Sequence, residues 1–474
     1  MVFSSLTFLY AFLPAALLVY FVCPARLRNG ALLLVSLVFY GWGEPVYILI
    51  MLLTIAVNYV AGRLIGRFGA RTGRSRAVMA VAVALSLLTL GFFKYTDFII
   101  GSVGGLFGSD LGALGIALPI GISFYTFQTL SYTIDVWRGD VKAQSNVVAF
   151  AAYVVMFPQL IAGPIVRYRE VERQLAKRTV GVSGFACGVR RFVVGLSKKV
   201  LLANRAGELW STVSAIDVGE LPAATAWLGA VAFAFQIYFD FSAYSDMAIG
   251  LGRMLGFSFA ENFDYPYISS SVTEFWRRWH ISLGTWFREY LYIPLGGNRN
   301  GTARTALNLL LVWTVTGLWH GASWNFVIWG FYFGVLIAAE KLFLSRLLDR
   351  LPKVVSTAAA MLAVLLGWVL FASENLPAAL AYLGAMLGAS GSAGNSETVY
   401  LLYTNAVLLA LCALGSTALP KRLWRSVTAR LENAGTIGAA AGTVIGNAAV
   451  LLAMALSTAC LVSDTYNPFL YFRF

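Results

Sequence analysis

Long runs of apolar residues, interrupted by short polar or basic stretches, make up most of this chain. A helix needs about 20 residues to cross the roughly 30 Å hydrocarbon core of a bilayer. Some of the runs have this length, some are shorter, and some are long enough for two crossings. The apolar segments are 5–24, 31–62, 77–108, 115–137, 148–166, 184–204, 223–252, 305–340, 354–373, 376–389, 398–418 and 437–463. They predict an all-α, polytopic membrane protein with roughly eleven transmembrane helices, built as a single membrane domain over 1–474.

The segment 31–62 has basic residues on both sides, which predicts that both of its ends are cytoplasmic. One continuous helix cannot begin and end on the same side of a membrane. The run from Gly41 to Pro45, GWGEP, lies in its middle and contains residues that break helices. The segment is therefore predicted to form two helices or a re-entrant pair.

The stretch 264–304 is too charged to span lipid and too aromatic for a solvated loop. Its ionisable residues include Glu274, Arg277, Arg278, His280, Arg288, Glu289 and Arg299. We predict helices that lie in, or re-enter from, the cytoplasmic interface and pack against protein. On one helical wheel through this stretch, His280 lies between an aromatic face and a cationic face. The alternative interpretation is a belt of aromatic and basic residues at the membrane interface.

Composition supports the membrane class and narrows the partners. The chain has 59% hydrophobic residues, 12% charged residues and a mean hydropathy of +0.74, whereas soluble domains carry about twice that charged fraction. The net charge of +13 comes from short basic clusters between apolar runs, the pattern of cytoplasmic loops, and not from a long basic tract. We therefore expect a lipid bilayer and no nucleic acid as partner. The four cysteines have no paired spacing and are predicted to be buried apolar residues.

The chain contains two histidines, His280 and His320. His320 lies inside the apolar segment 305–340, and an ionisable residue in a membrane segment is costly enough to be a functional candidate. An unprotonated imidazole there can act as general base toward a hydroxyl nucleophile. The alternative is a neutral histidine that is hydrogen-bonded between helices.

The sequence gives little indication of a metal site, a serine-hydrolase motif, a nucleotide-binding motif or an ion-binding site. The two histidines do not have the spacing of zinc ligands, so no metal is predicted. Neither a GxSxG motif, a P-loop nor a dinucleotide fingerprint lies in a suitable context. Asp240 and Asp246 lie near the end of an apolar segment, where pairing with arginine or capping of a helix is favoured over ion binding.

Three sequence blocks carry a specific resemblance. They are FQIYFDFSAYSDMAIG (235–250), TEFWRRWHISL (273–283) and GLWHG (317–321). The stretches 118–127 and 157–164 also match, as does the opening MVFSS (1–5), so the similarity covers nearly the whole chain. The chain thereby resembles the membrane-bound O-acyltransferase family, and within it the integral membrane subunits of alginate O-acetylation.

The resemblance implies an acetyltransferase with a tunnel across the bacterial cytoplasmic membrane. Acetyl-CoA is implied as the donor substrate, and no other cofactor is expected. His320 matches the invariant histidine of the family and His280 its second polar position, so both are predicted to be catalytic. The residues predicted to bind the donor are Arg277, Arg278, Trp279 and Arg288. Those predicted to line or support the tunnel are Asp240, Ser282, Trp319 and Asn325.

The aromatic tail 464–474 resembles the ends of several acyl-export proteins. The basic cluster before segment 437–463 is predicted to be cytoplasmic, which makes the tail extracytoplasmic. We predict that Tyr471 relays the acyl group to an extracytoplasmic SGNH-type acetyltransferase, which modifies the polysaccharide. The alternative is that the tail is an aromatic anchor at the interface.

Two other classes of function stay open at this stage. One is a transporter or flippase for polysaccharide precursors, which predicts duplicated halves or paired charges along a midplane path. The other is a non-catalytic scaffold of an exopolysaccharide complex, which tolerates the loss of His320.

Overall fold

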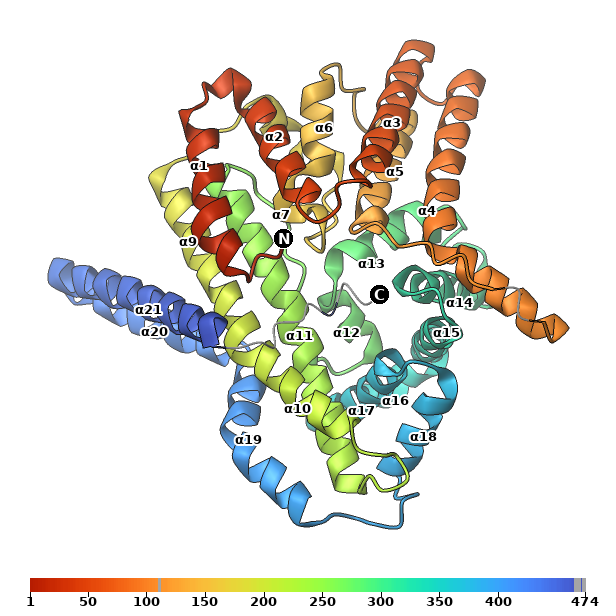
Figure 1. Cartoon of the computed structure of the whole chain (residues 1–474), viewed down its shortest axis with the longest axis vertical. Coiled ribbons are helices and arrows are strands. Elements are labelled where there is room, and N and C mark those ends of the chain that lie inside the picture. The colour runs from red at the N-terminus through yellow and green to blue at the C-terminus, as the bar shows by residue number, and fades with distance from the viewer. Residues whose placement is uncertain (110–111, 464–469, 471–474) are drawn as a thin grey trace. The chain divides into compact units, whose positions relative to one another are not determined.

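The computed structural model describes residues 1–109, 112–463 and 470, and these residues form helices and connecting loops without a β-strand (Figure 1). The predicted all-α class is confirmed. The described chain divides into two compact units: Met1–Phe192 with Met247–Glu261, and Val193–Asp246 with Asn262–Phe474. Two long helices, α9 (Val182–Ser197) and α11 (Ala223–Met254), contribute residues to both units.

The first unit contains the N-terminal helices. They are η1 (Phe8–Phe12), α1 (Leu13–Val22), η2 (Ala25–Leu27), α2 (Arg28–Gly41), α3 (Ile48–Phe68), α4 (Gly73–Phe107), α5 (Ile122–Arg138), α6 (Val147–Val155), α7 (Phe157–Leu160) and α8 (Tyr168–Ala176), followed by the first part of α9. The predicted break in segment 31–62 is confirmed, since α2 ends at Gly41 and α3 begins at Ile48.

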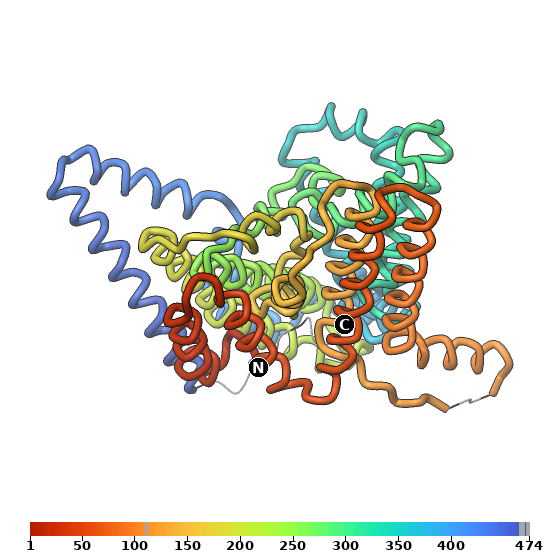
Figure 2. The backbone as a smooth tube through the Cα atoms, turned by 90° about the horizontal axis from the view of Figure 1, so that it is seen from above, coloured from red at the N-terminus to blue at the C-terminus, as the bar shows by residue number. Residues whose placement is uncertain are grey.

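The second unit contains both histidines that the sequence predicts to be catalytic, His280 and His320. Its helices before residue 321 are η3 (Lys198–Ala203), α10 (Asn204–Ser214), most of α11, η4 (Pro266–Ile268), α12 (Val272–Arg278), α13 (Ile281–Phe287), η5 (Arg288–Tyr292) and α14 (Gly301–His320). Those that follow are α15 (Trp324–Ala339), η6 (Glu340–Leu344), α16 (Ser345–Leu348), α17 (Lys353–Ala372), α18 (Leu376–Met386), α19 (Ser396–Gly415), α20 (Leu419–Asn433) and α21 (Gly435–Ser463). Within this unit α20 and α21 run side by side (Figures 1 and 2).

Seven helical stretches among the described residues are long and apolar enough to cross a membrane. They are Ile48–Phe68, Gly73–Phe107, Ala223–Met254, Trp324–Leu348, Lys353–Ala372, Ser396–Gly415 and Gly435–Ser463. The multi-pass class is thus supported, whereas the predicted count of roughly eleven spans is not confirmed. One reason is that the apolar segment 148–166 folds as the short helices α6 and α7, of nine and four residues.

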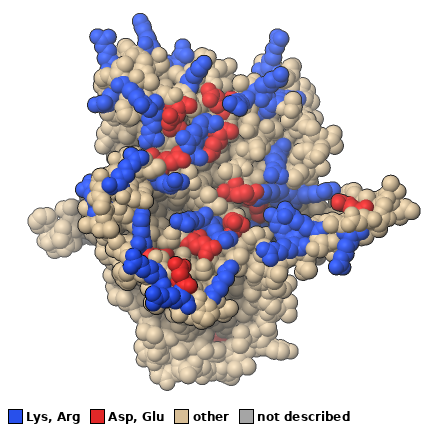
Figure 3. All heavy atoms as spheres, turned by 180° about the vertical axis from the view of Figure 1, so that it is seen from behind, with Lys and Arg blue, Asp and Glu red and all other residues tan. Residues whose placement is uncertain are grey.

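The surface carries the charge that the composition predicts. Lys and Arg side chains predominate over Asp and Glu on the face drawn in Figure 3, in keeping with the net charge of +13. The prediction for the cysteines is only partly right, because Cys412 is buried but Cys187 is exposed. The four thiols are not paired in disulfides.

Helices α14 and α15 cross at two glycines, and this crossing fixes the position of His320. A Cβ atom on Gly317 would lie 2.1 Å from the carbonyl oxygen of Phe326, and one on Gly330 would lie 2.2 Å from that of Trp313. Only glycine allows two helical backbones to approach so closely. The GLWHG block therefore places His320 at the end of a helix that is pressed against its neighbour.

The stretch 264–304 contains the short helices η4, α12, α13 and η5, and their place at the membrane interface stays a prediction. The single helical wheel through His280 is wrong. The helix ends at Arg278, and His280 has a left-handed backbone with φ of 46°. Backbone hydrogen bonds explain the break, because Asp264 N–H donates to the carbonyl of Arg278 and Ile281 N–H donates to that of Asn262. The loop before α12 thus takes the bonds that a continuous helix would use.

Candidate active site

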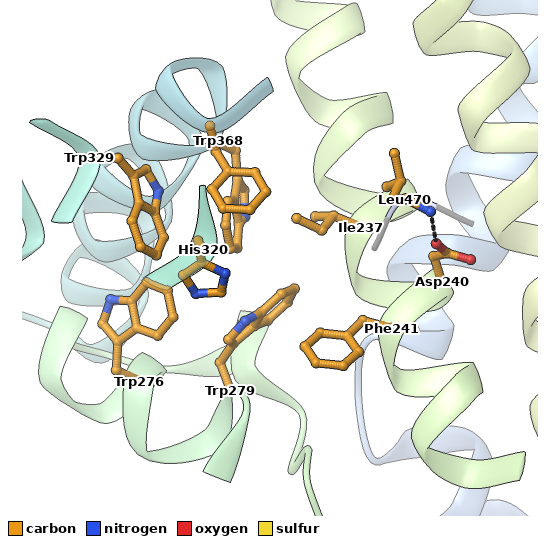
Figure 4. A pocket seen from close by; sticks show the side chains of 10 residues that line it. Ile237, Asp240, Phe241, Trp276, Trp279, His320, Trp329, Trp368 and Leu470 are labelled. Carbon is orange, nitrogen blue, oxygen red and sulfur yellow. Dashed lines mark hydrogen bonds between the residues drawn. The ribbon is translucent and has the colours of Figure 1, made fainter. Parts of the chain in front are cut away.

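His320 lines a cavity of about 30 Å³ inside the second unit (Figure 4). The other lining residues are Ile237, Asp240, Phe241, Trp276, Trp279, Trp329, Trp368, Phe371 and Leu470. They come from α11, α12, α15 and α17, from Trp279 directly after α12, and from one residue of the C-terminal tail. The cavity has room for a water molecule but not for an acyl thioester, so substrates require side chains of the wall to move.

Aromatic rings enclose the imidazole of His320. Its centroid lies 5.1 Å from the ring of Trp329 and 5.5 Å from that of Phe371, both nearly perpendicular to it. His320 as a whole is 8% exposed. An enclosure of this kind keeps bulk water from a reactive acyl group, and a fixed imidazole can still exchange a proton with a hydroxyl inside it.

The side chain of Asn262 determines the hydrogen-bonding state of His280. Asn262 Oδ1 accepts from the backbone N–H of Ser282 at 3.1 Å and from Ser282 Oγ at 2.9 Å. A backbone N–H can only donate, so this atom is the amide oxygen and not the amide nitrogen. His280 Nδ1 lies 3.2 Å from the same oxygen and must therefore donate to it. The proton of the neutral ring is on Nδ1, which leaves Nε2 as an acceptor.

His280 Nε2 is buried and has no hydrogen-bond partner among the described residues. Burial lowers the pKa of His280 from 6.5 to about 3, because the charged imidazolium would lose its hydration. The ring is therefore neutral at physiological pH and suited to accept a hydrogen bond.

Trp319, predicted to line or support the tunnel, has its ring near both histidines. Its ring centroid lies 5.0 Å from that of His320 and 6.3 Å from that of His280. Ser282 and Asn325, two of the other three residues predicted to line or support the tunnel, have contacts of their own. Ser282 shares Asn262 with His280, and Asn325 donates to the carbonyls at the end of α17, at 3.0 Å and 2.6 Å.

The residues predicted to bind the donor occupy different environments. Arg277 is exposed and lines a second cavity of 580 Å³, while Trp279 lines the cavity of His320. Arg278 forms ion pairs with Glu274 at 2.8 Å and, more loosely, with Asp264 at 3.6 Å. Arg288 is exposed after the end of α13.

The two aspartates of α11 are paired, but with lysines and not with the predicted arginines. Asp240 lies 2.7 Å from Nζ of Lys199, and Asp246 lies 2.9 Å from Nζ of Lys198. The π-helical turn η3 begins at these two consecutive lysines. Its wider turn changes the direction of the following side chains, as π-bulges do.

Asp240 also contacts the tail. Its Oδ2 accepts the backbone N–H of Leu470 at 2.9 Å, and the Leu470 side chain lines the cavity of His320 (Figure 4). Tyr471, the predicted relay, lies outside the described residues, as do residues 464–469 and 472–474. Within the described part of the chain, no group of three or more His, Cys, Asp or Glu residues could hold a metal ion.

Sequence reasoning missed three residues that hold this region together: Lys199, Asn262 and Glu340. Lys199 and Glu340 are charged residues within apolar segments, a signal that could have identified them. Asn262 gives no comparable signal, because a polar residue before the short helices has many ordinary uses.

Comparison with known proteins decides the class of this site. Residues 140–371, which include both histidines and the lining residues from α11 to α17, match the model of the membrane-bound O-acyltransferase family. The chain is 41% identical, over the full length of both proteins, to the probable alginate O-acetylase AlgI of Azotobacter vinelandii. The chain belongs to the membrane-bound O-acyltransferase family. The resemblance carried by the sequence blocks is confirmed.

Other relatives of this membrane-bound O-acyltransferase act in different settings. The peptidoglycan O-acetyltransferase of Helicobacter pylori is 32% identical, over 82% of this chain and 80% of the relative. The teichoic acid D-alanyltransferase of Bacillus subtilis is 26% identical, over 47% of this chain and 59% of the relative. The protein is an O-acyltransferase and a multi-pass membrane protein.

Proposed function

We propose that this O-acyltransferase takes an acetyl group from acetyl-CoA on the cytoplasmic side of the bacterial inner membrane and delivers it for O-acetylation of an extracellular polysaccharide such as alginate. The names of two similar proteins, an alginate O-acetylase and a peptidoglycan O-acetyltransferase, support the class of acceptor. The observation that carries the proposal is the imidazole of His320 in an enclosed aromatic cavity.

In the proposed reaction His320 is the general base. It takes the proton of an acceptor hydroxyl as the hydroxyl oxygen attacks the thioester carbonyl. The new C–O bond forms, the C–S bond breaks, and the leaving thiolate takes the proton back from the imidazolium. His280, with its bare Nε2, orients the reactants by accepting a hydrogen bond from one of them.

The donor enters, in this proposal, through the 580 Å³ cavity on the other side of α12. Arg277, Lys341 and Lys353 are cations among its lining residues, and acidic side chains line it as well. Guanidinium and ammonium groups bind phosphate, which the donor carries in its nucleotide part. Helix α12 has Arg277 at this cavity and Trp276 at the cavity of His320, and Trp279, directly after the helix, lines the cavity of His320 as well. One short helix therefore connects the two cavities.

The acceptor hydroxyl is proposed to be that of Tyr471. A phenol with a pKa near 10 is both a nucleophile when its proton is removed and a good leaving group in a second transfer. Leu470, the residue before it, lines the cavity of His320. An extracytoplasmic SGNH-type acetyltransferase then takes the acetyl group from the tyrosine and places it on the polymer.

The test uses a strain that lacks the native gene and expresses His320→Ala. Removal of a general base costs about a hundredfold to ten-thousandfold in rate, so acetyl groups on the secreted polymer should fall to background. Size-exclusion chromatography and membrane fractionation establish that the variant is folded and inserted. Near-normal polymer acetylation by His320→Ala would remove His320 from the reaction.

A further inference from the structure

A buried ion pair lies next to the active-site cavity. Lys199 Nζ is 2.7 Å from Asp240 Oδ1, and each side chain is 3% exposed. Asp240 belongs to α11, one of the helices apolar enough to span a membrane. Burying two charges costs several kcal/mol per ion before their attraction is counted. Such a pair inside an apolar segment therefore indicates a function beyond joining two helices.

The second oxygen of the same carboxylate binds the tail. Asp240 Oδ2 accepts the backbone N–H of Leu470 at 2.9 Å. Leu470 is 7% exposed, and it lines the cavity together with Ile237 and Phe241 of α11 (Figure 4). Leu470 thus has a backbone hydrogen bond to α11, and its side chain lines the same cavity as two apolar residues of that helix.

The two oxygens of Asp240 therefore serve different partners. Lys199 pairs with one oxygen of the carboxylate, and the other oxygen accepts a backbone N–H. An ionised carboxylate makes a stronger hydrogen bond than a neutral acceptor. A backbone hydrogen bond is independent of the tail's side chains, whereas the largely apolar cavity of His320 favours an apolar side chain at 470. Together the two contacts specify which residue of the tail occupies this position.

We propose that the Lys199–Asp240 pair is the docking site for the C-terminal tail, and that it sets the register in which the tail meets the cavity of His320. The inference deepens the proposed function, in which the next residue, Tyr471, accepts the acetyl group. A tail that slips by one residue would present phenylalanine or leucine in place of the tyrosine.

Two double variants test the dock with both buried charges removed. Lys199→Met with Asp240→Asn, the amide variant, keeps an oxygen that can accept the Leu470 N–H. Lys199→Met with Asp240→Leu, the acceptor-free variant, has the same branching but no acceptor. If leucine prevents folding, Asp240→Ala takes its place.

The reporter is Leu470→Cys, which keeps the backbone N–H, in a chain whose native cysteines are replaced by serine. Modification by a water-soluble maleimide is followed in detergent without any acyl donor. The native cysteines are Cys23, Cys187, Cys412 and Cys460. Loss of one neutral hydrogen bond should speed labelling about threefold to tenfold in the acceptor-free variant relative to the amide variant.

Slow labelling in the chain with the native pair and in the amide variant, together with fast labelling in the acceptor-free variant, supports the dock. Equal labelling rates in the native pair and in both double variants would overturn it. Because no acetyl group is transferred in this measurement, the result does not depend on whether Tyr471 is a relay. Conversely, Tyr471→Phe tests the relay while the dock is intact, so failure of one proposal is distinguishable from failure of the other.

Discussion

Replacing Glu340 by glutamine tests how strongly the site depends on the position of α12. Glu340 begins η6 and is 5% exposed. Its two carboxylate oxygens accept the backbone N–H groups of Val272 and Thr273, each at 2.7 Å. These groups are at the start of α12, the helix that carries Trp276 into the cavity of His320 and is followed directly by Trp279, which also lines that cavity.

The expected cost follows from these two hydrogen bonds. Glutamine has one oxygen acceptor, so Glu340→Gln keeps one bond without its charge and turns an NH₂ group toward the other N–H. A buried donor left without a partner costs about 1–3 kcal/mol, and hydrogen bonds to charged groups are worth about 1.5–3 kcal/mol. We therefore expect a destabilisation of about 2–4 kcal/mol, together with reduced acetyl transfer because α12 is less firmly held.

Thermal unfolding in detergent, followed by tryptophan fluorescence, measures the first effect, and acetyl transfer by the folded fraction measures the second. Glu397→Gln is the matched control, since Glu397 is exposed in the first turn of α19. Its unfolding temperature and activity should equal those of the native protein. If Glu340→Gln also behaves like the native protein in both assays, α12 is positioned by other contacts and the reasoning is refuted.

Three further predictions follow from the site. Arg277→Gln should raise the KM for acetyl-CoA several-fold with little change in kcat. Arg299→Gln, at an exposed arginine that does not line the 580 Å³ cavity, should change neither constant; an effect of Arg277→Gln on kcat alone would contradict a donor contact. In a ¹⁵N-histidine-labelled sample, His280 should show the Nδ1–H neutral form from pH 7 to pH 5, because its pKa is lowered to about 3. The unfolded chain binds that proton near pH 6.5 and the folded chain does not until about pH 3, so stability should fall as the pH drops through this window; an imidazolium signal at pH 5 would contradict this. Gly317→Ala should prevent the close crossing of α14 and α15, with loss of folded protein on gel filtration, whereas Gly91→Ala, with open space around its Cβ position, should be tolerated.

The general architecture could be predicted from the sequence because apolar runs and helix breakers act locally. The break between Gly41 and Ile48 is an example, since two glycines and a proline within five residues disfavour a continuous helix through local backbone preferences. The number of spans could not be predicted in this way. Whether an apolar run crosses a membrane or folds as two short buried helices depends on its neighbours, as α6 and α7 show.

The site was predictable only in part. His320 could be identified because an ionisable residue in an apolar segment is costly, and its block resembles a known family. The environment of His280 could not be predicted, because backbone hydrogen bonds to residues 262 and 264 break the helix there. Helical periodicity alone does not reveal such bonds. The partners of Asp240 are also nonlocal: Lys199 and Leu470 are far from it in sequence.

The central claim is that His320 activates the hydroxyl of Tyr471 to accept the acetyl group. The most direct measurement is mass spectrometry of the C-terminal peptide after the purified protein has been incubated with acetyl-CoA and without an extracytoplasmic partner. The account predicts an acetyl ester on Tyr471 in the native protein, and none in His320→Ala or in Tyr471→Phe. An unmodified peptide from protein that still supports polymer acetylation, or an undiminished ester in His320→Ala, would contradict it.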